Sequence, residues 1–301
     1  MAATPGGSPA TPFGRVLVAM VTPFTDDLAL DLDGAQRLAA HLVDERCDGL
    51  VISGTTGESP TTTDEEKERL LRAVVEAVGD RAHVVAGVGT NDTAHTVELA
   101  RQAEKAGAHG LLVVTPYYSK PPQAGLLHHF RTVADATGLP SMLYDIPGRS
   151  GVPIATETLV RLAEHERIVA VKDAKDDLAA ATEVLARTDL AYYSGTDILT
   201  LPLLAVGAVG VVSVPGHLVS RRLVDLVAAH AAGDVRRAIE INRSLLPAYA
   251  GFFRTQGAIM SKAALRLAGL PAGPVRPPLV DATDDEVGQL RRDLADAGIS
   301  L

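Results

Sequence analysis

Lys172 is the residue whose position most clearly suggests chemistry, because it ends the apolar run 168–171. A lysine held away from water loses affinity for its proton, and its neutral amine is a nucleophile that forms Schiff bases with carbonyl compounds. A lysine at a strand end more commonly extends its ammonium group to solvent. The position alone therefore allows either a catalytic or a solvent-exposed Lys172.

Polar residues also end other apolar runs, so that together with Lys172 seven ends carry them: Thr22, 54–56, Thr115, Tyr144, 194–195 and Ser213. The paired hydroxyls of Thr55 and Thr56 suit a carboxylate, and Tyr144 can transfer a proton. Arg149 can bind a carboxylate with two hydrogen bonds. Taken singly, each allows a plainer interpretation: a polar loop, a buried phenol or a surface arginine. Their number indicates a shared site.

The runs themselves predict eight buried strands, at 16–21, 49–53, 84–87, 110–115, 141–144, 168–172, 192–195 and 210–214. Continuously apolar runs are typical of parallel strands covered on both faces. Amphipathic helical patterns lie between them, near 31–46, 64–78, 94–106, 123–137, 156–165, 177–187 and 199–206. This alternation predicts an α/β fold, a (βα)8 TIM barrel, with its active site at the carboxyl ends of the strands. A doubly wound sheet is the alternative, but Thr22 and Pro23 replace its glycine-rich turn.

Three parts are expected along the chain: a disordered N-terminal tail at 1–12, the catalytic barrel at 13–219 and a C-terminal helical extension at 220–301. The tail is rich in Ala, Thr, Pro, Gly and Ser, unlike a signal peptide. Helical patterns near 220–232, 234–248, 255–268 and 284–297 make up the extension, with a rigid proline-rich connector at 271–278.

Composition narrows the class of function. The chain has 301 residues, 47% hydrophobic and 22% charged, with a net charge of −9, which disfavours nucleic acid or an anionic membrane as partner. Its one cysteine, Cys47, excludes an internal disulfide and a zinc site built on several thiolates. There is no apolar run of about 18 residues, so we expect a cytoplasmic protein. His128 and His129 fit helix packing better than a metal site, and the sequence predicts no metal site.

Six motifs, in this order and spacing, carry a resemblance: GTTGES at 54–59, TPYYSKPPQAGL at 115–126, YDIPGR at 144–149, VKDAK at 171–175, YYSGTD at 192–197 and GVVSV at 210–214. The chain resembles the dihydrodipicolinate synthase/N-acetylneuraminate lyase family of class I aldolase barrels. The resemblance covers nearly all of the folded chain. It is closest to the branch that condenses pyruvate with aspartate semialdehyde.

The resemblance implies catalytic roles for four residues. Lys172 would form the imine with pyruvate, and Tyr144 would carry protons to and from it. Thr55 and Tyr118 would complete a proton relay with Tyr144. In the family, the residue matching Tyr118 reaches in from a neighbouring subunit, so a homo-oligomer is expected, either a dimer or a homotetramer.

Substrate contacts follow from the same resemblance. Thr56 and the backbone at Val212 would hold pyruvate, Arg149 would bind the carboxylate of aspartate semialdehyde, and Gly195 would line the pocket. No cofactor is implied beyond the covalent imine on Lys172, and no metal. Another aldolase of the family, acting on a sugar acid or a hydroxyproline-derived substrate, is the first alternative, and the arginine argues against it. A non-catalytic ligand sensor is the second.

Regulation is implied less directly. Many family members are inhibited by lysine bound between subunits, and Asn91 and Tyr117 match that pocket. Asp64, Lys67 and His95 fall where inhibited enzymes often carry histidines and an acid. Without an acid at His95, the ammonium group of the inhibitor loses a partner. We therefore expect weak or absent inhibition by lysine.

Overall fold

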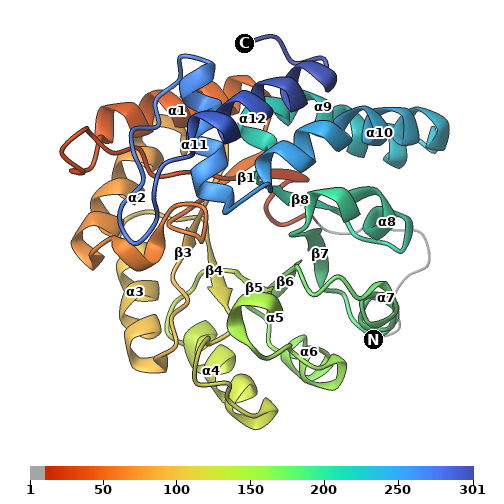
Figure 1. The fold of residues 1–301 in the computed structure, drawn as a ribbon. Helices are drawn as coiled ribbons and strands as arrows, with labels where there is room; N and C mark the ends of the chain where they lie inside the picture. Colours follow the sequence, from red (N-terminus) through yellow and green to blue (C-terminus); the bar gives the residue numbers. More distant parts are fainter. Residues whose placement is uncertain (1–10) are drawn as a thin grey trace.

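The computed structural model describes residues 11–301, and at its centre eight parallel strands form a closed barrel (Figure 1). The strands are β1 (Val16–Ala19), β2 (Gly49–Ile52), β3 (His83–Gly87), β4 (Gly110–Val114), β5 (Ser141–Asp145), β6 (Ile168–Asp173), β7 (Ala191–Ser194) and β8 (Gly210–Ser213). Because β8 pairs with β1, the sheet has no open edge. The predicted (βα)8 barrel is confirmed, and the doubly wound alternative is wrong. The tail predicted at 1–12 lies mostly outside the described residues.

Helices surround this barrel in the predicted order: α1 (Leu32–Asp44), α2 (Asp64–Val78), α3 (Thr93–Lys105), α4 (Gln123–Asp135), α6 (Thr156–Leu162), α7 (Leu178–Arg187) and α8 (Thr200–Ala205). Local chemistry sets their beginnings. The Thr63 hydroxyl accepts the Glu66 N–H at the start of α2, and the Glu66 carboxylate accepts the Thr63 N–H. Three short helical segments escaped prediction: η1 (Ser59–Thr61), α5 (Pro147–Ser150) and η2 (Asp197–Leu199).

The strands divide their side chains between two cores. In β5, Met142 and Tyr144 pack inside the barrel, whereas Leu143 packs against the surrounding helices. Alternate residues of a strand point to opposite faces, so both faces of each strand are covered. This explains why the strands are apolar throughout. It also directs Lys172, two residues after Ala170, toward the barrel interior.

The C-terminal helices are α9 (Gly216–Ala231), α10 (Val235–Phe252), α11 (Gly257–Leu267) and α12 (Asp284–Asp296). Helix α9 begins four residues before the predicted start near 220, and Val219 inside it has a non-helical backbone. Helix α10 continues through Pro247 to Phe252 rather than ending near 248. Tyr249 and Phe252 are buried there, and their packing extends the helix past the proline.

Two compositional predictions can be compared with the structure. Cys47 is buried, and burial raises the pKa of its thiol to about 12, as expected of a packing residue rather than a reactive thiol. Across residues 11–301, no helix is both long and apolar enough to cross a bilayer.

Candidate active site

Lys172 and Tyr144 lie side by side on neighbouring strands. Tyr144 of β5 pairs with Lys172 of β6 in the sheet register, and the Lys172 Nζ lies 4.3 Å from the centroid of the Tyr144 ring. Each residue is 5% exposed. The alternative in which the lysine extends to solvent is therefore wrong, because the side chain stays inside the mouth of the barrel.

The surroundings of Lys172 favour a neutral amine. Burial lowers its pKa to about 8, the negative charge of Asp197 works against this shift, and the positive charge of Arg149 adds to it. With a pKa of about 8, roughly a tenth of the Lys172 amine is neutral at pH 7, far more than for an ordinary lysine. That fraction is what a Schiff-base nucleophile needs.

Asp197 is a site residue that was not predicted from the sequence. It is fully buried and accepts hydrogen bonds from the Ser213 hydroxyl and, at 3.2 Å, from the Val214 N–H. Burial raises its pKa to about 6, while the hydrogen bond from Ser213 and the charge of Lys172 lower it. Its position directly after the β7 end, within the motif 192–197, was the signal that could have identified it.

Thr55 and Thr56 come from the loop that follows β2. The loop closes on itself, since the Glu58 N–H donates to the Thr55 carbonyl at 3.2 Å and the Ser59 N–H donates to the Gly54 carbonyl at 3.3 Å. Burial raises the pKa of Tyr144 to about 12, and the charge of Arg149 and a hydrogen bond with Thr55 oppose that rise. The tyrosine is therefore protonated at neutral pH and linked to the threonine.

Six of the predicted residues line one cavity of about 260 Å³: Thr55, Thr56, Tyr144, Arg149, Lys172 and Gly195. The extension contributes Phe253 and Gln256 to the wall, which the sequence did not reveal. A cavity of this size accommodates a small ligand. The arrangement combines a neutral amine, a phenol and a guanidinium in one space.

Two predicted contacts concern backbone. At Gly195, a Cβ atom would lie 2.9 Å from the Asp173 carbonyl oxygen and 3.1 Å from the Lys172 Cγ, so a side chain there would push on the lysine. Val212 is fully buried inside the barrel, and Val214 of the same segment lines the cavity instead.

Tyr118 is placed apart from Lys172. It is 89% exposed, has a positive φ of 71°, and lines an adjoining cavity of about 320 Å³ to which Thr55, Tyr144 and Arg149 also contribute. Such a φ costs energy for a residue with a Cβ atom. An aromatic side chain held in solvent at this energetic cost fits a contact with a second chain.

The residues matched to an inhibitor pocket form polar contacts of their own. The His95 Nε2 lies 2.8 Å from the Asp64 Oδ2, and the Lys67 Nζ lies 3.8 Å from the Asp64 Oδ1. Lys67 also donates to the Thr62 carbonyl at 2.5 Å. The carboxylate of Asp64 is therefore already engaged by two basic groups.

His129 of α4 is held by a neighbouring side chain. His129 is buried, and its Nδ1 lies 2.9 Å from the Thr93 hydroxyl. Within residues 11–301, no three His, Cys, Asp or Glu side chains are placed to hold one metal ion.

Comparison with known protein families gives a match over nearly the whole chain. The model of the "Dihydrodipicolinate synthetase family" matches residues 12–297. The 4-hydroxy-tetrahydrodipicolinate synthase of Acidothermus cellulolyticus is 74% identical over 289 residues, which cover 96% of this chain and 94% of the relative. 4-hydroxy-tetrahydrodipicolinate synthase 2 of Streptomyces coelicolor is 69% identical and covers 99% of each chain.

Solved structures give the same result. The crystal structure of dihydrodipicolinate synthase from Cyanidioschyzon merolae with lysine bound superposes with a TM-score of 0.95. Its sequence identity is 41%, and the superposition covers 97% of this chain and 100% of the other.

Proposed function

The chain belongs to the dihydrodipicolinate synthetase family, and we propose that Lys172 supplies the amine on which its reaction depends. The protein is a lyase with 4-hydroxy-tetrahydrodipicolinate synthase activity, in the biosynthesis of lysine and diaminopimelate. The observation that carries the proposal is the buried Lys172 amine, its pKa lowered to about 8, in one cavity with Tyr144 and Arg149.

The first half of the proposed reaction activates pyruvate. Neutral Lys172 attacks the ketone carbon, and loss of water gives an iminium ion that acts as an electron sink. Removal of a methyl proton then gives an enamine, a carbon nucleophile. Tyr144 moves the protons, and Thr55 passes them along the hydrogen bond described above. Tyr118 completes the relay from a second subunit.

The second half joins the two substrates. The enamine carbon attacks the aldehyde of aspartate semialdehyde, whose oxygen takes up a proton. The amino group of the new product then attacks the imine carbon, displaces Lys172 and closes the ring. The single water released on imine formation balances the sequence, and the lysine returns to its starting state, so the chemistry needs no further cofactor.

Positioning of the substrates is assigned to four further groups. Thr56 holds the carboxylate of pyruvate, and Val214, which lines the cavity where Val212 does not, borders its methyl side. Arg149, which also lines the cavity, binds the carboxylate of the semialdehyde with two hydrogen bonds. Gly195 leaves room for Lys172. The polyhydroxylated aldehyde on which a sugar-acid lyase acts carries no carboxylate for this guanidinium to bind.

Covalent trapping tests the proposal. Sodium borohydride added with pyruvate reduces an imine to a stable secondary amine, so the intact protein gains one reduced pyruvyl group. Peptide mapping is expected to place that group on Lys172 and to leave Lys175 unmodified, which makes the neighbouring lysine an internal control. An unchanged mass, or label spread over surface lysines, contradicts the assignment.

Assembly is proposed from Tyr118. Its 89% exposure suits a side chain that reaches into the site of a second subunit, so we infer a homo-oligomer, either a dimer or a tetramer of paired dimers. Sedimentation velocity gives the mass, and Tyr118→Phe is expected to lower kcat while the imine still forms. A fully active monomer contradicts this.

Weak or absent inhibition by lysine is proposed from the pairing of Asp64 with His95. An inhibitor ammonium group would have to compete with His95 and Lys67 for that carboxylate. Steady-state rates are expected to change little below millimolar lysine, and half-inhibition at a lower concentration contradicts the proposal.

We also propose the cytoplasm as the site of action, and a division into a barrel at 13–219 and an extension at 220–301. Helix α9 crosses that boundary at its non-helical Val219.

A further inference from the structure

The loop that carries Thr55 and Thr56 is held from outside the barrel. Glu58 ends the turn in a left-handed conformation, with φ of 55° and ψ of 37°, and only 3% of it is exposed. A residue with a Cβ atom adopts this conformation at an energetic cost, so the surroundings must hold it there. Its carboxylate points away from the cavity that the two threonines line.

The groups that bind Glu58 come from the C-terminal extension. The Lys262 Nζ of α11 lies 2.6 Å from its Oε1, and the Arg276 N–H donates to its Oε2 at 2.8 Å. Lys262 is fully buried and also donates to the Pro274 carbonyl at 2.7 Å. The contact at Oε1 is therefore a close, buried ion pair.

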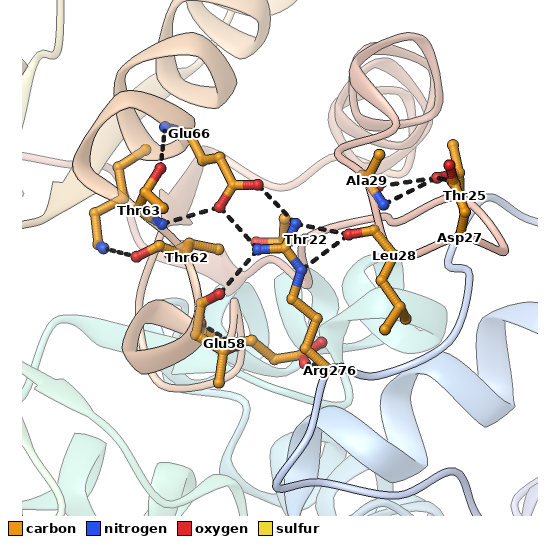
Figure 2. A network of polar contacts seen from close by, with 12 residues as sticks. Thr22, Thr25, Asp27, Leu28, Ala29, Glu58, Thr62, Thr63, Glu66 and Arg276 are labelled. Atoms are coloured by element: carbon orange, nitrogen blue, oxygen red, sulfur yellow. Dashed lines mark hydrogen bonds and ion pairs between the residues drawn. The ribbon is translucent and has the colours of Figure 1, made fainter.

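Arg276 fastens the same region at several points (Figure 2). Its guanidinium makes a bidentate contact with the Glu66 carboxylate, at 2.6 and 2.7 Å, at the start of α2. It also donates to the Leu28 carbonyl at 2.7 Å and to the Thr61 carbonyl at 2.8 Å. The arginine thus joins the segments after β1 and after β2 to the connector between α11 and α12.

The connector itself is seated tightly. A Cβ atom at Gly273, where φ is 66°, would lie 1.7 Å from the Phe24 carbonyl oxygen, so only glycine allows this approach. The Phe24 N–H donates to the Ala272 carbonyl at 3.3 Å. The Phe24 ring is covered by the Lys262 ammonium and the Arg276 guanidinium, each 4.1 Å from its centroid.

We propose that Glu58 is a positioning residue for Thr55 and Thr56, and that Lys262 and Arg276 of the extension hold it in place. A buried ion pair contributes little net stability, because desolvation of both charges offsets their attraction. Its effect is to fix one geometry of the turn. The inference rests on the proposed function, since it assigns Thr56 to pyruvate and Thr55 to the proton relay.

The expected kinetic pattern is specific. Glu58→Gln and Lys262→Met are each expected to raise KM for pyruvate and lower kcat, reducing kcat/KM for pyruvate about 10- to 100-fold. KM for aspartate semialdehyde is expected to stay within twofold, because Arg149 comes from α5 and not from this loop. Loss of stability alone would not produce that split.

Asp293→Asn is the matched control. This carboxylate is also buried in the extension, on α12, but its partners are Arg254, just after α10, and Gln289 rather than the loop after β2. The same acid-to-amide change is expected to lower Tm and to leave both KM values and kcat within twofold. Equal kinetic effects of Glu58→Gln and Asp293→Asn would overturn the proposal.

A double variant covers the case in which Glu58→Gln does not fold. Glu58→Leu with Lys262→Met leaves neither charge stranded, so the chain is expected to fold while kcat/KM for pyruvate falls by the same factor. Parental kinetics in the folded double variant would overturn the proposal. Borohydride trapping of the parental protein separates the two hypotheses. If pyruvate is not trapped on the parental protein, the role of Lys172 is refuted. If pyruvate is trapped but the variants keep parental kinetics, only the role of Glu58 is refuted.

Discussion

Lys172 and Lys262 have similarly lowered pKa values but different partners for their ammonium groups. They are 5% and 0% exposed, burial lowers the pKa of each to about 8, and each Nζ lies over an aromatic ring. The Lys262 ammonium group contacts the Glu58 carboxylate and donates to the Pro274 carbonyl. Lys172 faces a cavity, and Asp197 acts on it through charge alone while bonded to Ser213 and Val214.

The comparison separates two properties that are often treated as one. Burial lowers the pKa of a lysine, but a nucleophile also needs space for its substrate and a lone pair that is not directed at a fixed partner. By this criterion we propose that Lys172 reacts with substrate and that Lys262 positions the loop through Glu58. Experiments on both residues can sharpen or break that distinction.

Replacing each lysine by methionine has the largest expected effect. Lys172→Met removes the imine and is expected to lower kcat by about 10³-fold or more. Lys262→Met is expected to leave imine trapping intact at saturating pyruvate. Steady-state rates and trapped mass measure both. A Lys172→Met enzyme with a tenth of the parental kcat breaks the comparison.

The aromatic neighbours give the next largest effect. Lys172 lies over a tyrosine and Lys262 over a phenylalanine, so Tyr144→Phe makes the first environment resemble the second. The lost hydroxyl is expected to lower kcat about 10²- to 10⁴-fold, while pyruvate remains trappable.

Tyr192→Phe is the control for the tyrosine experiment. Tyr192 is fully buried, packs against the outer helices, and its hydroxyl has no hydrogen-bond partner among the described residues. Its kcat is expected to stay within twofold of the parent. A similar loss in both variants would attribute the effect to packing rather than to proton transfer.

The pH dependence gives the smallest effect. The neutral fraction of Lys172 grows as pH rises through its pKa of about 8, so the rate of imine formation is expected to rise through that range and then level off. Asp197→Asn removes a negative charge that raises this pKa, so the inflection moves to lower pH and the rate below pH 8 rises by less than about 10-fold. Stopped-flow trapping at a series of pH values measures it. An inflection that moves upward contradicts the assignment.

The parts of the fold with a strong local signal could be predicted. The apolar runs predicted the eight strands, and the pattern that begins with the acidic residues after Thr63 predicted the bounds of α2 correctly. Where packing overrides local preference the prediction failed: α10 passes Pro247 because Tyr249 and Phe252 are buried. The α9 start was missed because of the backbone break at Val219.

In the site, too, residues with a local sequence signal could be predicted and residues brought together only by folding could not. Thr55, Tyr144, Arg149 and Lys172 stand at strand ends or in the loops after them, and the barrel brings them together. Lys262 and Arg276 carry no comparable signal, because each lies far along the chain from Glu58 and only the folded molecule makes them neighbours. Phe253 and Gln256, the two wall residues between α10 and α11, were missed for this reason too.

The distance along the chain between Glu58 and Arg276, 218 residues, has a consequence for synthesis. A ribosome adds about 5–20 residues per second, so roughly 10–40 s pass between the two. During that interval the nascent barrel holds Thr55 and Thr56 on a turn whose anchor has not yet been made. A chain released early, before the connector, would possess every group that handles substrate and still lack the part that sets their geometry.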